Sequence, residues 1–108
     1  MLKLKSIKRG IKFFLQRLFC GFDESDTWSL DITIAKFILP RLIIFRRLTI
    51  TYPCEFKSIK EWHQILDKII TAFKIITERS FEDLTKEELI LKEEGLDLFR
   101  KYYHSLWW

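Results

Sequence analysis

Residues 58–79 read SIKEWHQILDKIITAFKIITER and carry the clearest helical pattern of the chain. Their large apolar side chains recur at helical spacing, which places them on one face of an α-helix. That face contains Trp62, Leu66, Ile69, Ile70, Phe73 and Ile76. Ser58 and Glu61 have the spacing of a capping box, in which a hydroxyl and a carboxylate satisfy the first free amides of a helix. We therefore predict an amphipathic helix that begins after Ser58 and ends near Arg79.

A second capping-box pattern, Thr85-Lys86-Glu87-Glu88, predicts the start of the last helix. The apolar positions of this helix are Leu89, Leu96, Phe99, Tyr103 and Leu106. Gly95 lies inside it, where glycine costs about 1 kcal/mol relative to alanine. We expect the backbone at Gly95 to pack closely against another helix.

Upstream, residues 28–47 form an almost uniformly apolar segment. One stripe holds Trp28, Ile32, Ala35 and Leu39, and the rest of the circumference is mostly covered by Leu30, Ile34, Phe37 and Ile38. The pattern predicts a buried central helix, opened by the polar run 23–26. Pro40 lacks a backbone donor and predicts a kink, with the helix continuing to about residue 47. Residues 48–52 are predicted to be an extended connector before Pro53.

The first helix, predicted over about residues 3–20, is basic and amphipathic. Residues 1–20 hold six lysines or arginines and no acid, although the whole chain carries only +4. Lys5, Lys8, Arg9 and Lys12 lie opposite the apolar positions, which are Ile7, Ile11, Phe14, Leu15 and Leu18. Gly21 is expected to end the helix. Three interpretations stay open: a packed helix with a solvated basic face, a contact with nucleic acid, or a contact with a membrane surface.

These patterns predict an all-α fold, a compact bundle of about four helices that forms a single domain over residues 1–108. A 48% hydrophobic content can supply a core, and 3 glycines with 2 prolines are too few for the turns of a β-sandwich. No apolar run is long enough to cross a bilayer, and the N-terminal stretch lacks the centre of a signal peptide. With only two cysteines, we expect a soluble, intracellular protein.

No catalytic or metal-binding motif stands out. His63 and His104 are the only histidines, and neither is at metal-ligand spacing from a cysteine. His63 and Asp67 share a helix face, which is equally typical of a solvated surface. The acidic positions of the last helix lack the Glu-x-x-His partners of a two-metal bundle site. We expect a non-enzymatic protein with no metal and no cofactor.

The most suggestive polar cluster is Arg41, Arg46 and Arg47 beside Pro40. Guanidinium groups suit phosphate or carboxylate ligands, and aromatic rings can stack on a nucleotide base. The candidate rings are Trp28, Tyr102, Tyr103, Trp107 and Trp108. The alternative is that the tryptophans anchor the core and the arginines pair with acids such as Asp31 or Glu94. The terminal tryptophan pair is hard to bury and suggests a subunit or partner interface.

Two runs carry a resemblance to known proteins: WSLDITIAKFILPRL at residues 28–42 and EGLDLFRKYYHSLW at residues 94–107. Together they resemble a group of small uncharacterised proteins encoded by tailed bacteriophages. The resemblance implies a viral protein that acts in the cytoplasm of the host bacterium or is assembled into a virion. It brings no catalytic residues with it.

On this basis we expect a binding protein that counters a host defence process. It would either sequester a small anionic nucleotide or block a host protein, as a monomer or as a homo-oligomer. The alternatives are a virion or assembly component and a nucleic-acid-binding protein that uses the basic N-terminal helix.

Overall fold

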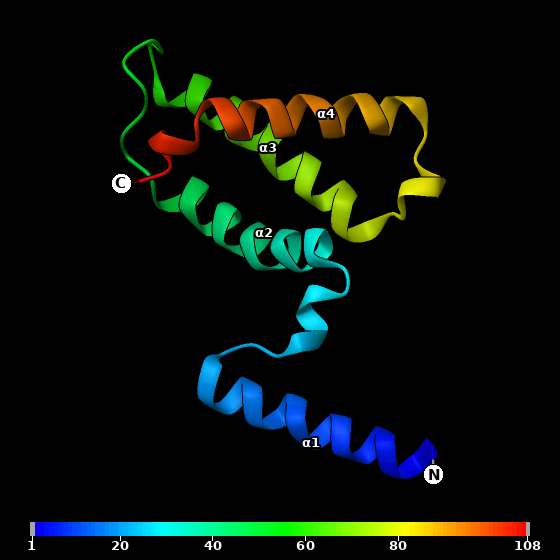
Figure 1. Cartoon of the computed structure of the whole chain (residues 1–108). Coiled ribbons are helices and arrows are strands. Elements are labelled where there is room, and N and C mark those ends of the chain that lie inside the picture. Colours follow the sequence, from blue (N-terminus) through cyan, green and yellow to red (C-terminus); the bar gives the residue numbers. More distant parts are fainter. Residues whose placement is uncertain (1, 108) are drawn as a thin grey trace. The chain divides into compact units, whose positions relative to one another are not determined.

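The computed structural model describes residues 2–107, and this part of the chain is 79% helical and contains no strand (Figure 1). Its four α-helices are α1 (Leu2–Cys20), α2 (Leu30–Leu48), α3 (Ile59–Glu78) and α4 (Lys86–Lys101). Three short 3-10 helices lie between or after them: η1 (Glu24–Thr27), η2 (Phe81–Asp83) and η3 (Tyr103–Ser105). The prediction of an all-α fold with four helices is confirmed.

The chain divides into two compact units, Met1–Thr33 and Ile34–Trp108. The division falls within α2, so the first turn of this helix belongs to the first unit and the rest to the second. Each unit is described by itself below. That the whole chain acts as a single domain stays a prediction.

In the first unit, α1 ends at Gly21 as predicted. Gly21 has a φ of 81°, the left-handed conformation that glycine adopts readily, and its amide donates to the Arg17 carbonyl at 3.2 Å. The polar run that follows caps η1 and not α2. Asp23 Oδ1 accepts from the Ser25 amide at 2.8 Å, and Asp26 Oδ2 accepts from the Asp23 amide at 3.2 Å. The predicted capping of the second helix by residues 23–26 was therefore wrong, and α2 begins at Leu30.

In the second unit, α2, α3 and α4 follow one another up and down, with α3 and α4 side by side (Figure 1). The core is built around α3, whose Trp62, Leu66 and Ile69 are fully buried. From α2 only Ala35 and Leu42 are buried in it. The expected central position of α2 was wrong, because only one side of it packs against the core: Ile38, Leu39 and Phe45 are half-buried there, whereas Ile34, Phe37, Ile43, Ile44 and Leu48 stay exposed.

Gly95 marks the closest approach of α3 and α4. A Cβ added to Gly95 would stand 2.5 Å from the Lys68 carbonyl oxygen and closer still to the Ala72 Cβ. Only glycine fits there without a shift of the backbone. The predicted close packing at this residue is confirmed.

The two predicted capping boxes differ in the structure. At the start of α4, Thr85 Oγ1 accepts from the Glu88 amide at 3.1 Å, and Glu88 Oε1 accepts from the Thr85 amide at 3.2 Å. This box is confirmed. Ser58 is the N-cap residue of α3 but makes no side-chain cap hydrogen bond, and Glu61 Oε2 accepts instead from the Lys57 amide at 2.9 Å. The reciprocal box predicted there was wrong, although the helix begins where expected.

The α2 helix continues through Pro40 to Leu48, as expected. Proline leaves the carbonyl four residues before it without its usual amide donor and disturbs the turn around it. In this turn, Arg41 Nη1 donates to the Phe37 carbonyl oxygen at 2.8 Å. The bond goes to Phe37 and not to Lys36, which lies four residues before the proline, so it adds a donor to the disturbed turn without replacing the missing one. Of the connector predicted over residues 48–52, residues 49–52 have no regular secondary structure, whereas Leu48 still belongs to α2.

Candidate functional site

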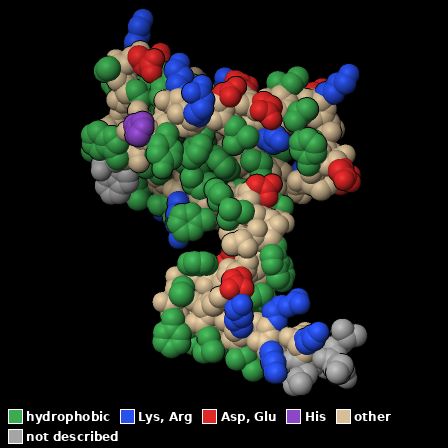
Figure 2. All heavy atoms as spheres, viewed as in Figure 1, with side chains coloured by type: hydrophobic (Ala, Val, Ile, Leu, Met, Phe, Trp, Pro, Cys, Tyr) green, Lys and Arg blue, Asp and Glu red, His purple; other side chains and the backbone are tan. Residues whose placement is uncertain are grey.

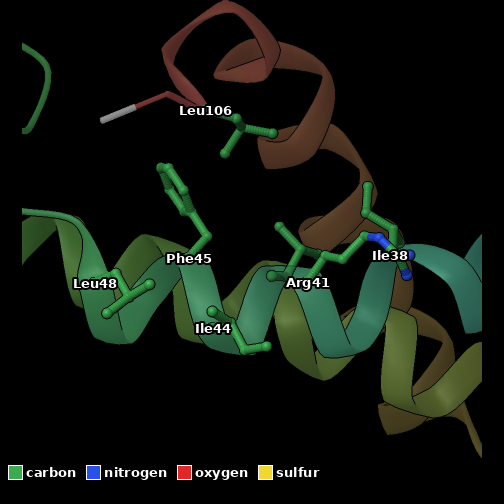
Figure 3. Close-up of a pocket in the computed structure, with 7 residues that line it drawn as sticks. Ile38, Arg41, Ile44, Phe45, Leu48 and Leu106 are labelled. Carbon is green, nitrogen blue, oxygen red and sulfur yellow. The ribbon is translucent and has the colours of Figure 1, made fainter.

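A surface groove of about 430 Å³ runs along the exposed side of α2. It lies entirely within the second unit, and six of its seven lining residues come from α2. They are Ile38, Arg41, Leu42, Ile44, Phe45 and Leu48, with Leu106 from the segment after η3 as the seventh (Figure 3). Arg41 is the one charged residue in this lining.

The groove continues into an apolar stripe along α2. Residues three or four apart lie on the same side of an α-helix, and at this spacing Ile34, Phe37, Ile44 and Leu48 are all exposed. Figure 2 shows hydrophobic side chains gathered over the viewed face of this unit. Contiguous exposed apolar surface of this kind marks interaction sites in proteins. The groove and stripe together are named the α2 face below.

Arg41 lies within the α2 face and is held by its own helix. Its guanidinium carbon is 3.7 Å from the centroid of the Phe37 ring, and Nη1 is bonded to the Phe37 carbonyl. Stacking on an aromatic ring leaves the other face and the remaining N–H donors of the guanidinium free. Arg41 can therefore donate hydrogen bonds to an anionic group at the edge of an otherwise apolar groove.

The structure does not bring Arg46 and Arg47 to Arg41. Arg46 pairs with Asp67 of α3, with Nη2 at 3.2 Å from Oδ2 and Nε on Oδ1. Arg47 is exposed on another side of α2. Since each residue advances by about 100° around a helix, positions five and six apart point about 140° and 120° away from the first. The predicted three-arginine cluster is thus spread around the helix. Glu94, one of the acids predicted to pair with these arginines, pairs instead with Lys68 at 2.9 Å.

The predicted aromatic residues also occupy different environments. Tyr102 is only 6% exposed and lies in the core, with its ring centroid 5.5 Å from Phe56 and 5.4 Å from Trp62. Burial, and next the neighbouring Glu55 carboxylate, raise the pKa of Tyr102 above its usual value. The Tyr102 ring is enclosed by other core side chains, so the structure shows Tyr102 as a core residue.

Tyr103, Trp107 and Trp28 are all exposed, but the first two belong to the second unit and Trp28 to the first. Tyr103 packs edge-on against Phe99 at 5.7 Å. Trp107 lines a small cavity of about 120 Å³ with residues 51–53 of the connector. Trp28 is 67% exposed and packs edge-on against Phe13, with 5.6 Å between the ring centroids. The predicted role of Trp108 lies outside the described residues.

The predicted basic contact residues all lie on α1 in the first unit. Lys5, Lys8 and Arg9 are exposed, and Lys12 Nζ is 2.9 Å from Glu24 Oε2. This lysine and Gln16 hold the pKa of Glu24 below its usual value. The first unit thus presents a basic helix whose C-terminal half is partly neutralised by the segment that follows.

Nothing in residues 2–107 forms a group of three metal-ligating side chains. Asp67, considered as a partner for His63, is held by Arg46. His63 Nε2 is buried and has no hydrogen-bond partner among the described residues. No described helix has the length and apolar character needed to cross a membrane.

Six of the seven lining residues of the groove were not predicted as site residues from the sequence, namely Ile38, Leu42, Ile44, Phe45, Leu48 and Leu106. The signal was present, because a helix that is apolar all round needs partners on every side to be buried. In the described part of this unit, α3 and α4 are the only α-helices beside α2, and one apolar side of α2 stays exposed.

Comparison of the chain with protein-family models, curated proteins and solved structures finds no match.

Proposed function

We propose that this chain is a non-enzymatic binding protein that uses the α2 face to hold an amphipathic helix of a partner protein. The observation that carries the proposal is the groove of about 430 Å³, lined by six apolar residues and Arg41. Grooves with apolar walls recognise helices whose apolar residues recur every three or four positions. The stripe from Ile34 to Leu48 extends the groove along most of α2, which gives a helical partner several successive anchor points.

The charge in the groove favours a partner helix with an acidic residue beside its apolar positions. Arg41 keeps free donors after stacking on Phe37, and a guanidinium group binds a carboxylate through two parallel hydrogen bonds. A basic partner helix would be repelled by Arg41.

The resemblance to phage proteins extends the proposal to the biological role. The partner would be a protein of the host bacterium, and occupying its helix would block a host defence process in the bacterial cytoplasm. A homo-oligomer is compatible with this role if the α2 face stays open.

Sequestering a small anionic nucleotide is the less favoured form of the proposal. Three observations count against it: Arg46 is paired with Asp67, Arg47 lies away from Arg41, and Tyr102 is buried. A lone arginine at an apolar groove offers little to a phosphate. Native mass spectrometry of gently purified protein tests this form, because a retained nucleotide released on denaturation would restore it.

A matched pair of variants tests the α2 face. Ile43 and Ile44 are adjacent, 44% and 46% exposed, but only Ile44 lines the groove. We expect the Ile44→Asp variant to lose a partner captured from host lysate, and the Ile43→Asp variant to retain it. Equal capture by both variants would contradict the proposal. Recovery of the chain in purified phage particles would favour the virion alternative instead.

A further inference from the structure

In the first unit, the segment that follows α1 contacts the polar side of this helix and does not cover its apolar side. The segment after Gly21 turns back onto the polar side: Glu24 bonds to Lys12 and Gln16, and Asp23 Oδ2 lies 3.1 Å from Arg17 Nε. The Trp28 ring packs on Phe13, which lies on this same side of the helix. The unit's own contacts therefore leave the opposite side of α1 without a partner.

That opposite side is apolar and exposed. It is formed by Ile7, Ile11, Phe14, Leu15 and Leu18, each between 45% and 62% exposed. Phe19 at its edge is 83% exposed. Five large apolar side chains on one helix face form a continuous strip that a purely solvated helix does not need.

Positive charge borders this strip. Lys5, Lys8 and Arg9 are exposed, none is in an ion pair with a described acidic residue, and residues 1–20 contain no acid. An apolar strip bordered by lysine and arginine is the pattern of a helix that lies in the interface of an anionic lipid bilayer. The lysines then meet lipid headgroups while the apolar strip enters the acyl boundary.

We infer that α1 binds the surface of anionic lipid membranes and lies parallel to it. This accounts for both faces of the helix at once. Nucleic acid would use the basic side and leave the apolar strip in water. A second copy of α1 would cover the strip but would bring two helices with six basic residues each together. Charges in the middle of α1, such as Lys8 and Lys12, oppose insertion across the bilayer.

Flotation of the full chain with lipid vesicles tests this inference. We expect binding to vesicles of phosphatidylcholine with phosphatidylglycerol, and at least about tenfold less binding to phosphatidylcholine alone, because the basic residues need anionic headgroups. Raising the salt concentration should reduce the binding without abolishing it, since the apolar contribution is not screened.

Two variants with the same charge change separate the apolar strip from simple charge attraction. Ile11→Asp places a carboxylate in the strip, whereas Ser6→Asp places one on the exposed polar side. We expect Ile11→Asp to lower vesicle binding by about tenfold or more and Ser6→Asp by less than about threefold. Far-UV circular dichroism confirms that both variants keep their helix content.

The inference is overturned if the folded wild-type chain does not float with anionic vesicles. It is also overturned if both variants lose binding equally, which would show charge attraction alone. Retention on DNA without vesicle binding would assign the basic side to nucleic acid. Self-association that Ile11→Asp abolishes, again without vesicle binding, would assign the strip to a second copy.

Discussion

Gly95 and Gly10 both lie inside helices but have opposite surroundings. A Cβ at Gly95 would collide with the Lys68 carbonyl and with Ala72, whereas a Cβ at Gly10 would have nothing within 4 Å. We expect Gly95→Ala to lower the free energy of unfolding by about 1–3 kcal/mol, because overpacking outweighs the gain in helix propensity. Urea denaturation followed by circular dichroism measures this.

The control for this prediction is Gly10→Ala. In open space the alanine should stabilise α1 by about 0.5–1 kcal/mol and increase the helix content. A Gly95→Ala variant as stable as the wild type would show that α3 and α4 can separate without cost. The sequence already indicated a packing role for Gly95, because a costly residue in a long helix needs a reason, but it did not identify Ala72 as the partner.

Tyr102 gives the second unit a dependence on alkaline pH. Its pKa is raised above the usual value of about 10, first by burial and then by Glu55. The buried neutral form therefore stabilises the fold fully below about pH 10, and this contribution is lost as the pH rises through the raised pKa. We expect the Tyr102→Phe variant to lose less stability than the wild type between pH 10 and strongly alkaline conditions.

The neighbouring residue provides the control. Tyr103 is 58% exposed, so Tyr103→Phe should leave the alkaline pH dependence of the urea midpoint as it is in the wild type. Identical pH profiles for both phenylalanine variants would disprove the role of Tyr102. The sequence analysis named both tyrosines as stacking candidates, because nothing in the local sequence distinguishes the buried one from the exposed one.

At the scale of the element, two N-caps that look alike in sequence differ in their bonds. Thr85 accepts from the Glu88 amide, whereas Ser58 makes no side-chain bond to its helix. We expect Thr85→Ala to cost about 1 kcal/mol of unfolding free energy, and Ser58→Ala to cost less than about 0.5 kcal/mol. Thermal or urea unfolding of the two variants measures the difference, and equal losses would contradict it.

The arginines of α2 show which element-level information the sequence held. Their order along the helix already implied that residues 41, 46 and 47 point to three different sides, so a helical projection rules out convergence. The pairing of Arg46 with Asp67 depends on how α2 meets α3, and no local pattern encodes that. The apolar side of α2 was visible in the sequence, but whether other helices cover it depends on the packing of the whole unit.

At the scale of the whole molecule, the four α-helices could be predicted from hydrophobic periodicity, capping residues and the helix-ending residues Gly21 and Pro53. The division into two units did not, because the boundary falls inside the continuous α2 helix. Composition and turn residues mark where helices end, and they carry no signal for which helices share a core. The candidate groove depends on that missing information, which is why only Arg41 of its lining was identified from the sequence.

The distribution of buried side chains predicts how stability varies along the chain. Among the described residues, the largest fully buried side chains lie in α3, namely Trp62, Leu66 and Ile69, while the side chains of α1 are exposed or half-buried. Amides in well-packed helices exchange only through global unfolding, whereas helices with few tertiary contacts open locally. Hydrogen–deuterium exchange should therefore be slowest in α3 and much faster in α1. Anionic vesicles should slow the exchange in α1 and leave that in α3 unchanged. Equal protection of the two helices without lipid would show that a protein surface covers the apolar strip of α1.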